Sequence, residues 1–109
     1  MTKLLHRRCT ATVAGPLSEA EINAYLAQVR GWKFAEGAIE KTHVFMNFHQ
    51  TMAFVNALAW ICHAEDHHPD VKLSYNRCVV RFNTHSVSGI SINDFICAAK
   101  VDALLPDGG

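Results

Sequence analysis

The stretch from residue 71 to residue 85 limits the fold of this chain most strongly, because it has the alternating pattern of a β-hairpin. Apolar and polar residues alternate up to a turn at Asn76-Arg77, and the alternation resumes after it. Successive side chains of a strand point to opposite faces of a sheet, so one face of both strands is apolar. The pattern predicts two antiparallel strands, with Tyr75 opposite Cys78.

A second hairpin is predicted between residues 32 and 45. Trp32 and Phe34 flank Lys33, and alternation continues on the far side of a turn at Glu36-Gly37. Here the alternation is mixed, so the pattern predicts two strands without fixing their register.

Three helices are indicated by N-terminal capping signals, in which a Ser or Asn side chain accepts a hydrogen bond from the helix start. These signals pair Ser18 with Glu21, Asn47 with Gln50, and Ser91 with Asp94. Apolar residues at helical spacing follow each signal. The second helix is the most apolar, so we expect it to be central, with Met52, Val55, Ala59 and Cys62 on one face that is widened by Phe54, Leu58 and Ile61. Pro69 should end it by Asp66, and Pro106 should end the last helix.

The order helix, strand, strand, helix, strand, strand, helix predicts an α+β two-layer sandwich. In it a four-stranded antiparallel sheet carries three helices on one face. We expect one domain over residues 1–109, with residues 1–16 and 106–109 loosely ordered. The other sheet face would meet water or a second subunit, and Trp32 and Phe45 could serve such pairing, so a homodimer or homotetramer is expected.

Composition argues against two classes of partner. Ten basic residues balance ten acidic ones, so the formal net charge is 0, whereas nucleic-acid and membrane-surface binders need a basic face. No apolar run approaches the ~20 residues of a membrane span. The four cysteines contain no C-x-x-C pair, and we expect them to be reduced, in a cytoplasmic protein.

The corner Asp66-His67-His68-Pro69 is the strongest candidate site. Adjacent side chains share neither a helix face nor a strand face, so a His-His pair between helix and strand suits chemistry better than packing. Extending the predicted hairpin register brings His68, or His67 after a slip of one residue, opposite His85. Asp94 begins the next helix shortly afterwards and is expected at the same end of the sheet.

Each of these residues also has a structural explanation. One histidine of the pair could interact with the helix dipole, His85 could be a surface residue, and Asp94 could only cap its helix. We interpret three further histidines as structural or surface residues: His43, His49 and His63. A zinc site is the rival function, and its potential ligands are Cys62, His63, His67, His68 and His85. No metal-binding spacing accompanies them, so we expect no metal.

The sequence resembles the pterin-4a-carbinolamine dehydratases from Leu17 onward. The resemblance rests on Gly31-Trp32, Glu65-Asp66-His67-His68-Pro69, Tyr75, Thr84-His85 and Asp94, with the spacing between them. His63 stands where the family often has an acid, and Val71 where an aromatic residue is common in the family.

The resemblance implies a lyase that dehydrates 4a-hydroxytetrahydrobiopterin to quinonoid dihydropterin in tetrahydrobiopterin recycling, with no cofactor. It implies that His67 and His85 transfer protons and that Asp94 orients an imidazole and favours its charged form. Imidazoles, with an ordinary pKa of about 6.5, suit an acid and a base working near neutral pH. The remaining residues would hold or surround the pterin: His68, Pro69, Asp66, Trp32, Thr84 and Ser86.

The same resemblance leaves a second function open. Members of the family also act as a dimerisation cofactor for a transcription factor, and related folds assist assembly of a large enzyme. A non-catalytic binding or assembly module could keep this fold without turnover.

Overall fold

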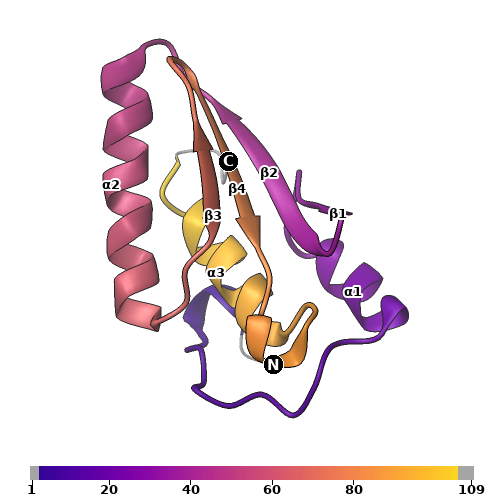
Figure 1. Cartoon of the computed structure of the whole chain (residues 1–109). Helices are drawn as coiled ribbons and strands as arrows, with labels where there is room; N and C mark the ends of the chain where they lie inside the picture. Colours follow the sequence, from indigo (N-terminus) through magenta and orange to yellow (C-terminus); the bar gives the residue numbers. More distant parts are fainter. Residues whose placement is uncertain (1–2, 106–109) are drawn as a thin grey trace.

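A computed structural model describes residues 3–105 (Figure 1). Its elements are η1 (Leu4–His6), α1 (Glu19–Leu26), β1 (Lys33–Ala35), β2 (Ala38–Val44), α2 (Phe48–Glu65), β3 (Asp70–Leu73), β4 (Arg77–Phe82), η2 (His85–Val87) and α3 (Ile92–Asp102). Apart from the two short 3-10 turns, η1 and η2, the predicted order of helices and strands is confirmed. No helix within the described residues is long and apolar enough to cross a membrane.

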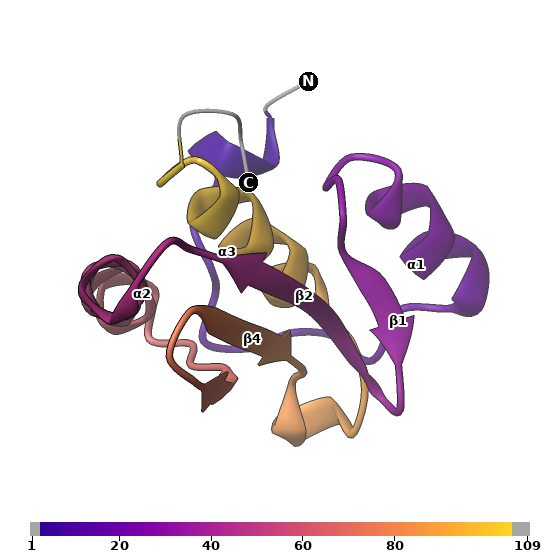
Figure 2. The same cartoon turned by 90° about the horizontal axis from the view of Figure 1, so that it is seen from above.

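The two-layer architecture is also confirmed. The four strands form one antiparallel sheet in the order β1-β2-β4-β3. Figure 2 shows the three helices on one side of this sheet, with α3 between α2 and α1. The helix-facing residues of β2 and β4, such as Ile39, Val80 and Phe82, are fully buried beneath them.

The first hairpin turns where the sequence predicts. Ala35 pairs with Ala38, and the two turn residues between them, Glu36 and Gly37, both have positive φ. Right-handed strand twist favours turns of this hand, and glycine adopts such a φ without steric cost.

The predicted register of the second hairpin is wrong by two residues. Cys78 pairs with Leu73, not with Tyr75, and strand pairing ends at Asp70 and Arg81. His68 and His85 are therefore not cross-strand partners. A shift of two residues keeps every side chain on the same face, so apolar alternation cannot distinguish the two registers. In the observed register the turn also contacts the residue after β2, since Phe45 N donates to Asn76 O at 2.8 Å.

The most buried helix is α3, not α2 as the sequence suggested. Its Phe95, Ile96, Ala98 and Val101 are all buried against the sheet. α2 lies beside it over the β3 end of the sheet (Figure 1), so one side of α2 stays in solvent.

The buried face of α2 is narrower than the predicted one, and three of its four residues, Phe54, Leu58 and Cys62, were predicted. It consists of Thr51, Phe54, Leu58 and Cys62. Of the other residues predicted for this face, Ala59 is exposed, and three are only partly buried: Met52, Val55 and Ile61.

Residues 3–13 form an N-terminal arm that packs against the body of the molecule, although the sequence suggested a loosely ordered start. Leu4 of η1 is buried in the core. Further along, Thr10 N donates to Asn93 Oδ1 at 3.1 Å, and Asn93 Nδ2 donates back to Thr10 O at 2.8 Å. The other predicted loose end, residues 106–109 with Pro106, lies outside the described residues.

Candidate active site

A pocket of about 250 Å³ opens where four separate segments meet. The segments are the N-terminal arm, the corner between α2 and β3, the region from the end of β4 into η2, and the first turn of α3. They gather at the lower end of the molecule in Figure 1. The lining residues are Thr10, Ala11, Val13, Asp66, His67, His68, Asn83, Thr84, His85, Ser86 and Asn93.

His67 reaches this pocket because α2 ends sharply. Asp66 adopts the left-handed conformation, with φ of 52°, and His67 N still donates to Cys62 O at 3.1 Å. The chain thus turns away from the helix axis at the residue before the imidazole. The ring of His67 stacks on Phe82, with 5.9 Å between ring centroids, and its side chain is largely buried.

Asp94 holds the His67 ring from beneath the pocket. Its Oδ1 lies 2.6 Å from His67 Nε2, and its side chain is fully buried. An ionised carboxylate only accepts hydrogen bonds, so this contact assigns a proton to Nε2 and leaves Nδ1 available to gain or lose one.

The second oxygen of Asp94 is committed to the start of α3. Oδ2 accepts hydrogen bonds from Ser91 N at 2.9 Å and from Thr84 Oγ1 at 2.8 Å. The predicted capping box is therefore present, and the same carboxylate also contacts the imidazole. The cap that the sequence predicts for Asp94 is thus confirmed, and its role in catalysis stays a prediction.

His85 and Ser86 enter the pocket on a short loop beyond β4. Thr84 and Gly89 close the base of this loop, with Thr84 N donating to Gly89 O at 2.8 Å. His85 is exposed and starts η2, and His68 is exposed on the opposite segment. The predicted convergence of His67, His68 and His85 near Asp94 thus exists, but the loop creates it rather than strand pairing.

Two residues expected to contact substrate do not line this pocket. Trp32 is buried elsewhere, and its Nε1 donates to both carboxylate oxygens of Asp102 at 3.0 and 3.1 Å. It is consequently also unavailable for pairing between subunits. Pro69 lines a separate apolar pocket between α2 and β3. In contrast, Asp66, His68, Thr84 and Ser86 all lie on the wall of the histidine pocket.

Sequence reasoning missed part of that wall. Thr10, Ala11 and Val13 of the arm belong to it, and no motif marks them. Asn83 and Asn93 were also missed. Of these residues, only Asn93 could have been found from the sequence. It lies beside Asp94 in the first helical turn, where a polar side chain next to a capping box can form hydrogen bonds with a neighbouring segment.

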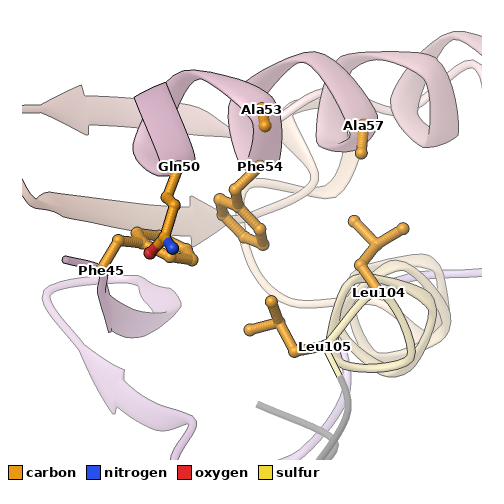
Figure 3. Close-up of a pocket in the computed structure, with 7 residues that line it drawn as sticks. All are labelled: Phe45, Gln50, Ala53, Phe54, Ala57, Leu104 and Leu105. Carbon is orange, nitrogen blue, oxygen red and sulfur yellow. The ribbon is translucent and has the colours of Figure 1, made fainter. Parts of the chain in front are cut away.

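A larger apolar pocket lies between α2 and the end of α3, and no acid or base is among the described residues that line it (Figure 3). Its volume is about 350 Å³, and its lining residues are Phe45, Gln50, Ala53, Phe54, Ala57, Leu104 and Leu105. Among the described residues that line it, the Gln50 amide is the only polar side chain, whereas the histidine pocket is lined by three imidazoles that could act as acid or base.

The five rival zinc ligands do not all lie together, because Cys62 and His63 are outside the histidine pocket. Within residues 3–105, no three His, Cys, Asp or Glu side chains are placed to hold a metal ion. Cys62 points into the core, whereas the exposed His63 stacks on Trp60.

The fold and the pocket define a class: small α+β proteins with an imidazole–carboxylate pair at one end of a helix-covered sheet. Residues 15–104 match the family model described as pterin 4 alpha carbinolamine dehydratase, and the chain belongs to that family. A protein of Nitrosomonas eutropha, provisionally named pterin-4-alpha-carbinolamine dehydratase, is 50% identical over 105 residues, covering 94% of this chain and 93% of its own.

Two solved structures share the fold. A transcriptional coactivator/pterin dehydratase from Brucella melitensis has a TM-score of 0.80 and 32% identity, covering 83% of this chain and 98% of its own. A pterin dehydratase-like protein, identified as a RuBisCO assembly factor in the alpha-carboxysome, has a TM-score of 0.61 and 22% identity. It covers 72% of this chain and 93% of its own, and at that identity the likeness concerns the fold alone.

Proposed function

We propose that this protein dehydrates 4a-hydroxytetrahydrobiopterin to quinonoid dihydropterin and water, in the recycling of tetrahydrobiopterin. The observation that carries the proposal is the 2.6 Å contact between His67 Nε2 and Asp94 Oδ1, at a pocket also lined by His68 and His85. Family membership supports the same reaction.

The reaction needs one acid and one base. The C4a–O bond breaks as an acid protonates the leaving hydroxyl, and a base removes the N5 proton as the N5–C4a double bond forms. In our proposal His67 and His85 perform these two transfers, each worth typically about 10²–10⁴ in rate. Asp94 orients His67 and stabilises its protonated form. We assign His68 to holding the pterin ring, with Asp66, Thr84 and Ser86 around it.

The decisive experiment measures the loss of the 4a-carbinolamine absorbance with purified protein and no added metal. We expect His67→Ala and His85→Ala each to lower kcat at least about 100-fold. His49→Ala is the matched control, because His49 is exposed on α2 and outside the pocket. Equal rates for all three variants and the wild type would contradict the roles assigned to His67 and His85.

A non-catalytic assembly module is the second candidate. It is favoured by the fold shared with the RuBisCO assembly factor. In that case the wild-type protein should be silent in the dehydratase assay and should retain a partner in stoichiometric amount during affinity purification. An active enzyme that recovers no such partner contradicts it.

We also propose that the protein is a homodimer or homotetramer. β3 is an edge strand, and three apolar side chains on it or just after it are exposed: Val71, Leu73 and Tyr75. An edge of this kind can pair with a second copy. Light scattering should give at least twice the 12.1 kDa chain mass, and Leu73→Lys should shift it towards one chain. A monomeric wild-type protein would refute the proposal.

A further inference from the structure

Two thiols lie side by side at the back of the N-terminal arm. The Sγ atoms of Cys9, on the arm, and Cys97, on α3, are 3.5 Å apart, although the residues are 88 positions apart in the chain. Both cysteines are free. Cys9 is partly exposed, whereas Cys97 is fully buried.

This proximity is held by contacts on both sides of Cys9. Cys9 N donates to Glu65 Oε1 at 2.8 Å, and the paired hydrogen bonds between Thr10 and Asn93 fix the next residue. Asn93 lies one helical turn before Cys97 on α3. The arm is thus anchored to the same helix face that carries the second thiol.

We propose that Cys9 and Cys97 form a reversible disulfide when the protein meets a peroxide, and that this bond clamps the arm against α3. Because Thr10, Ala11 and Val13 line the histidine pocket, the clamp fixes one wall of that pocket. Its effect on turnover rests on the proposed function, whereas the disulfide itself does not.

The chemistry balances with hydrogen peroxide as the oxidant. The Cys9 thiolate attacks one peroxide oxygen, the O–O bond breaks, and a sulfenic acid and hydroxide result. The Cys97 thiol then passes its proton to the sulfenic oxygen as its sulfur attacks the Cys9 sulfur. The S–O bond breaks, and the oxygen leaves as water with the sulfenic and thiol protons. Two thiols and one peroxide give one disulfide and two waters, and two electrons pass from sulfur to oxygen.

The environment assigns the first step to Cys9. The hydrogen bond with Cys9 and burial raise the pKa of the Cys97 thiol far above its ordinary value, so Cys97 stays protonated and shielded. A disulfide needs about 2.05 Å between sulfurs, so the pair must close by roughly 1.5 Å. The arm can supply this movement because it is a surface segment without its own strand or long helix.

Cys62 is the competing partner. It is buried next to the same pair, and burial raises the pKa of its thiol to about 11. Cys78 lies apart, within β4. Since trypsin cleaves after Lys and Arg, the four cysteines fall on four different peptides: 9–30 for Cys9, 42–72 for Cys62, 78–81 for Cys78 and 82–100 for Cys97.

The experiment treats the full chain with hydrogen peroxide, alkylates the remaining thiols in denaturant and maps the tryptic peptides by mass spectrometry. We expect the 9–30 and 82–100 peptides to be joined, with a loss of two hydrogens and full reversal by dithiothreitol. Cys78→Ser should behave like the wild type, and Cys9→Ser should form no cross-link. A link through Cys62, or oxidation of Cys9 without any link, overturns the assignment.

A second measurement tests the clamp. Closing a loop of 88 residues should raise the melting temperature of the peroxide-treated protein by at least about 5 °C, and Cys9→Ser should show no such rise. A cross-linked protein that melts at or below the temperature of the reduced form would show that the bond strains the arm instead of holding it. Neither measurement depends on dehydratase activity.

Discussion

Asp94 shows how one side chain can serve local structure and chemistry together. Its Oδ2 satisfies a backbone N–H at the start of α3, and its Oδ1 contacts the His67 ring. Because the carboxylate is fully buried and accepts three hydrogen bonds, it has little freedom to turn away from the imidazole. The capping box therefore positions the pocket as well as the helix.

His43 lies in the core and should make folding sensitive to pH. Its ring packs 4.6 Å from that of Phe54, and within the described residues neither ring nitrogen has a hydrogen-bond partner. Burial, aided by the charge of Lys41, lowers the pKa of His43 to about 4. The unfolded chain therefore binds a proton at His43 near pH 6.5, whereas the folded chain does not. The free energy of unfolding falls as pH drops below that value.

We expect the free energy of unfolding to fall by about 2 kcal/mol between pH 7 and pH 5 because of His43 alone. Urea unfolding at several pH values measures this change. His43→Leu should reduce the change of the free energy of unfolding with pH between pH 7 and pH 5. The carboxyl of Glu65 adds little in this range, because its pKa is lowered from an already acidic value. A variant with an unchanged slope would show that other histidines cause the dependence.

At the scale of elements, two helices begin with the same capping box but use it differently. In α1, Ser18 Oγ accepts from Glu21 N at 3.2 Å, in an exposed position away from the pocket. In α3, Ser91 Oγ accepts from Asn93 N at 3.2 Å and shares a 2.7 Å hydrogen bond with Thr84 Oγ1. The α3 box thus joins the helix start to Thr84, at the base of the loop that carries His85.

Ser18→Ala and Ser91→Ala form a matched pair of variants. Each should lower the free energy of unfolding by about 1 kcal/mol, because each removes one helix cap. Only Ser91→Ala should also lower dehydratase kcat, by roughly tenfold, because it loosens the network around Asp94. Chemical unfolding and initial rates measure the two effects. Equal loss of activity in both variants would contradict a special role for the α3 box.

At the scale of the whole molecule, a buried ion pair ties three regions together. Lys41 of β2 lies 3.1 Å from Asp102 at the end of α3, and it also donates to Arg30 O at 2.9 Å. Trp32 donates to the same carboxylate. Burial raises the pKa of Asp102, and the hydrogen bonds from Trp32 and Lys41 oppose that rise.

Lys41→Met should leave the Asp102 carboxylate buried without its countercharge and lower the free energy of unfolding by about 3 kcal/mol. Adding Asp102→Asn should recover part of the loss, because the amide oxygen still accepts from Trp32 and no charge is buried. Urea unfolding of the wild type, the single variant and the double variant tests this. A single variant as stable as the wild type would mean that the pair contributes little.

Several features of the fold and candidate site followed from the residues directly. The capping boxes at Ser18 and Ser91, the Glu36-Gly37 turn and the end of α2 at Asp66 are all present. Each depends on residues within about one turn of one another, so local hydrogen bonding and backbone sterics are sufficient to specify it. The gathering of His67, His68 and His85 near Asp94 was also predicted, through an incorrect register.

Element types and their order were therefore determined by the sequence itself, as was the gathering of three histidines near Asp94. Only the tertiary structure decided the register that pairs Leu73 with Cys78 and the central place of α3. It also decided the path of the arm, which brings Thr10 to the pocket and Cys9 to Cys97. The physical reason is that these features depend on contacts between distant segments. Apolar patterning specifies which face of an element is buried, but not which neighbour covers it.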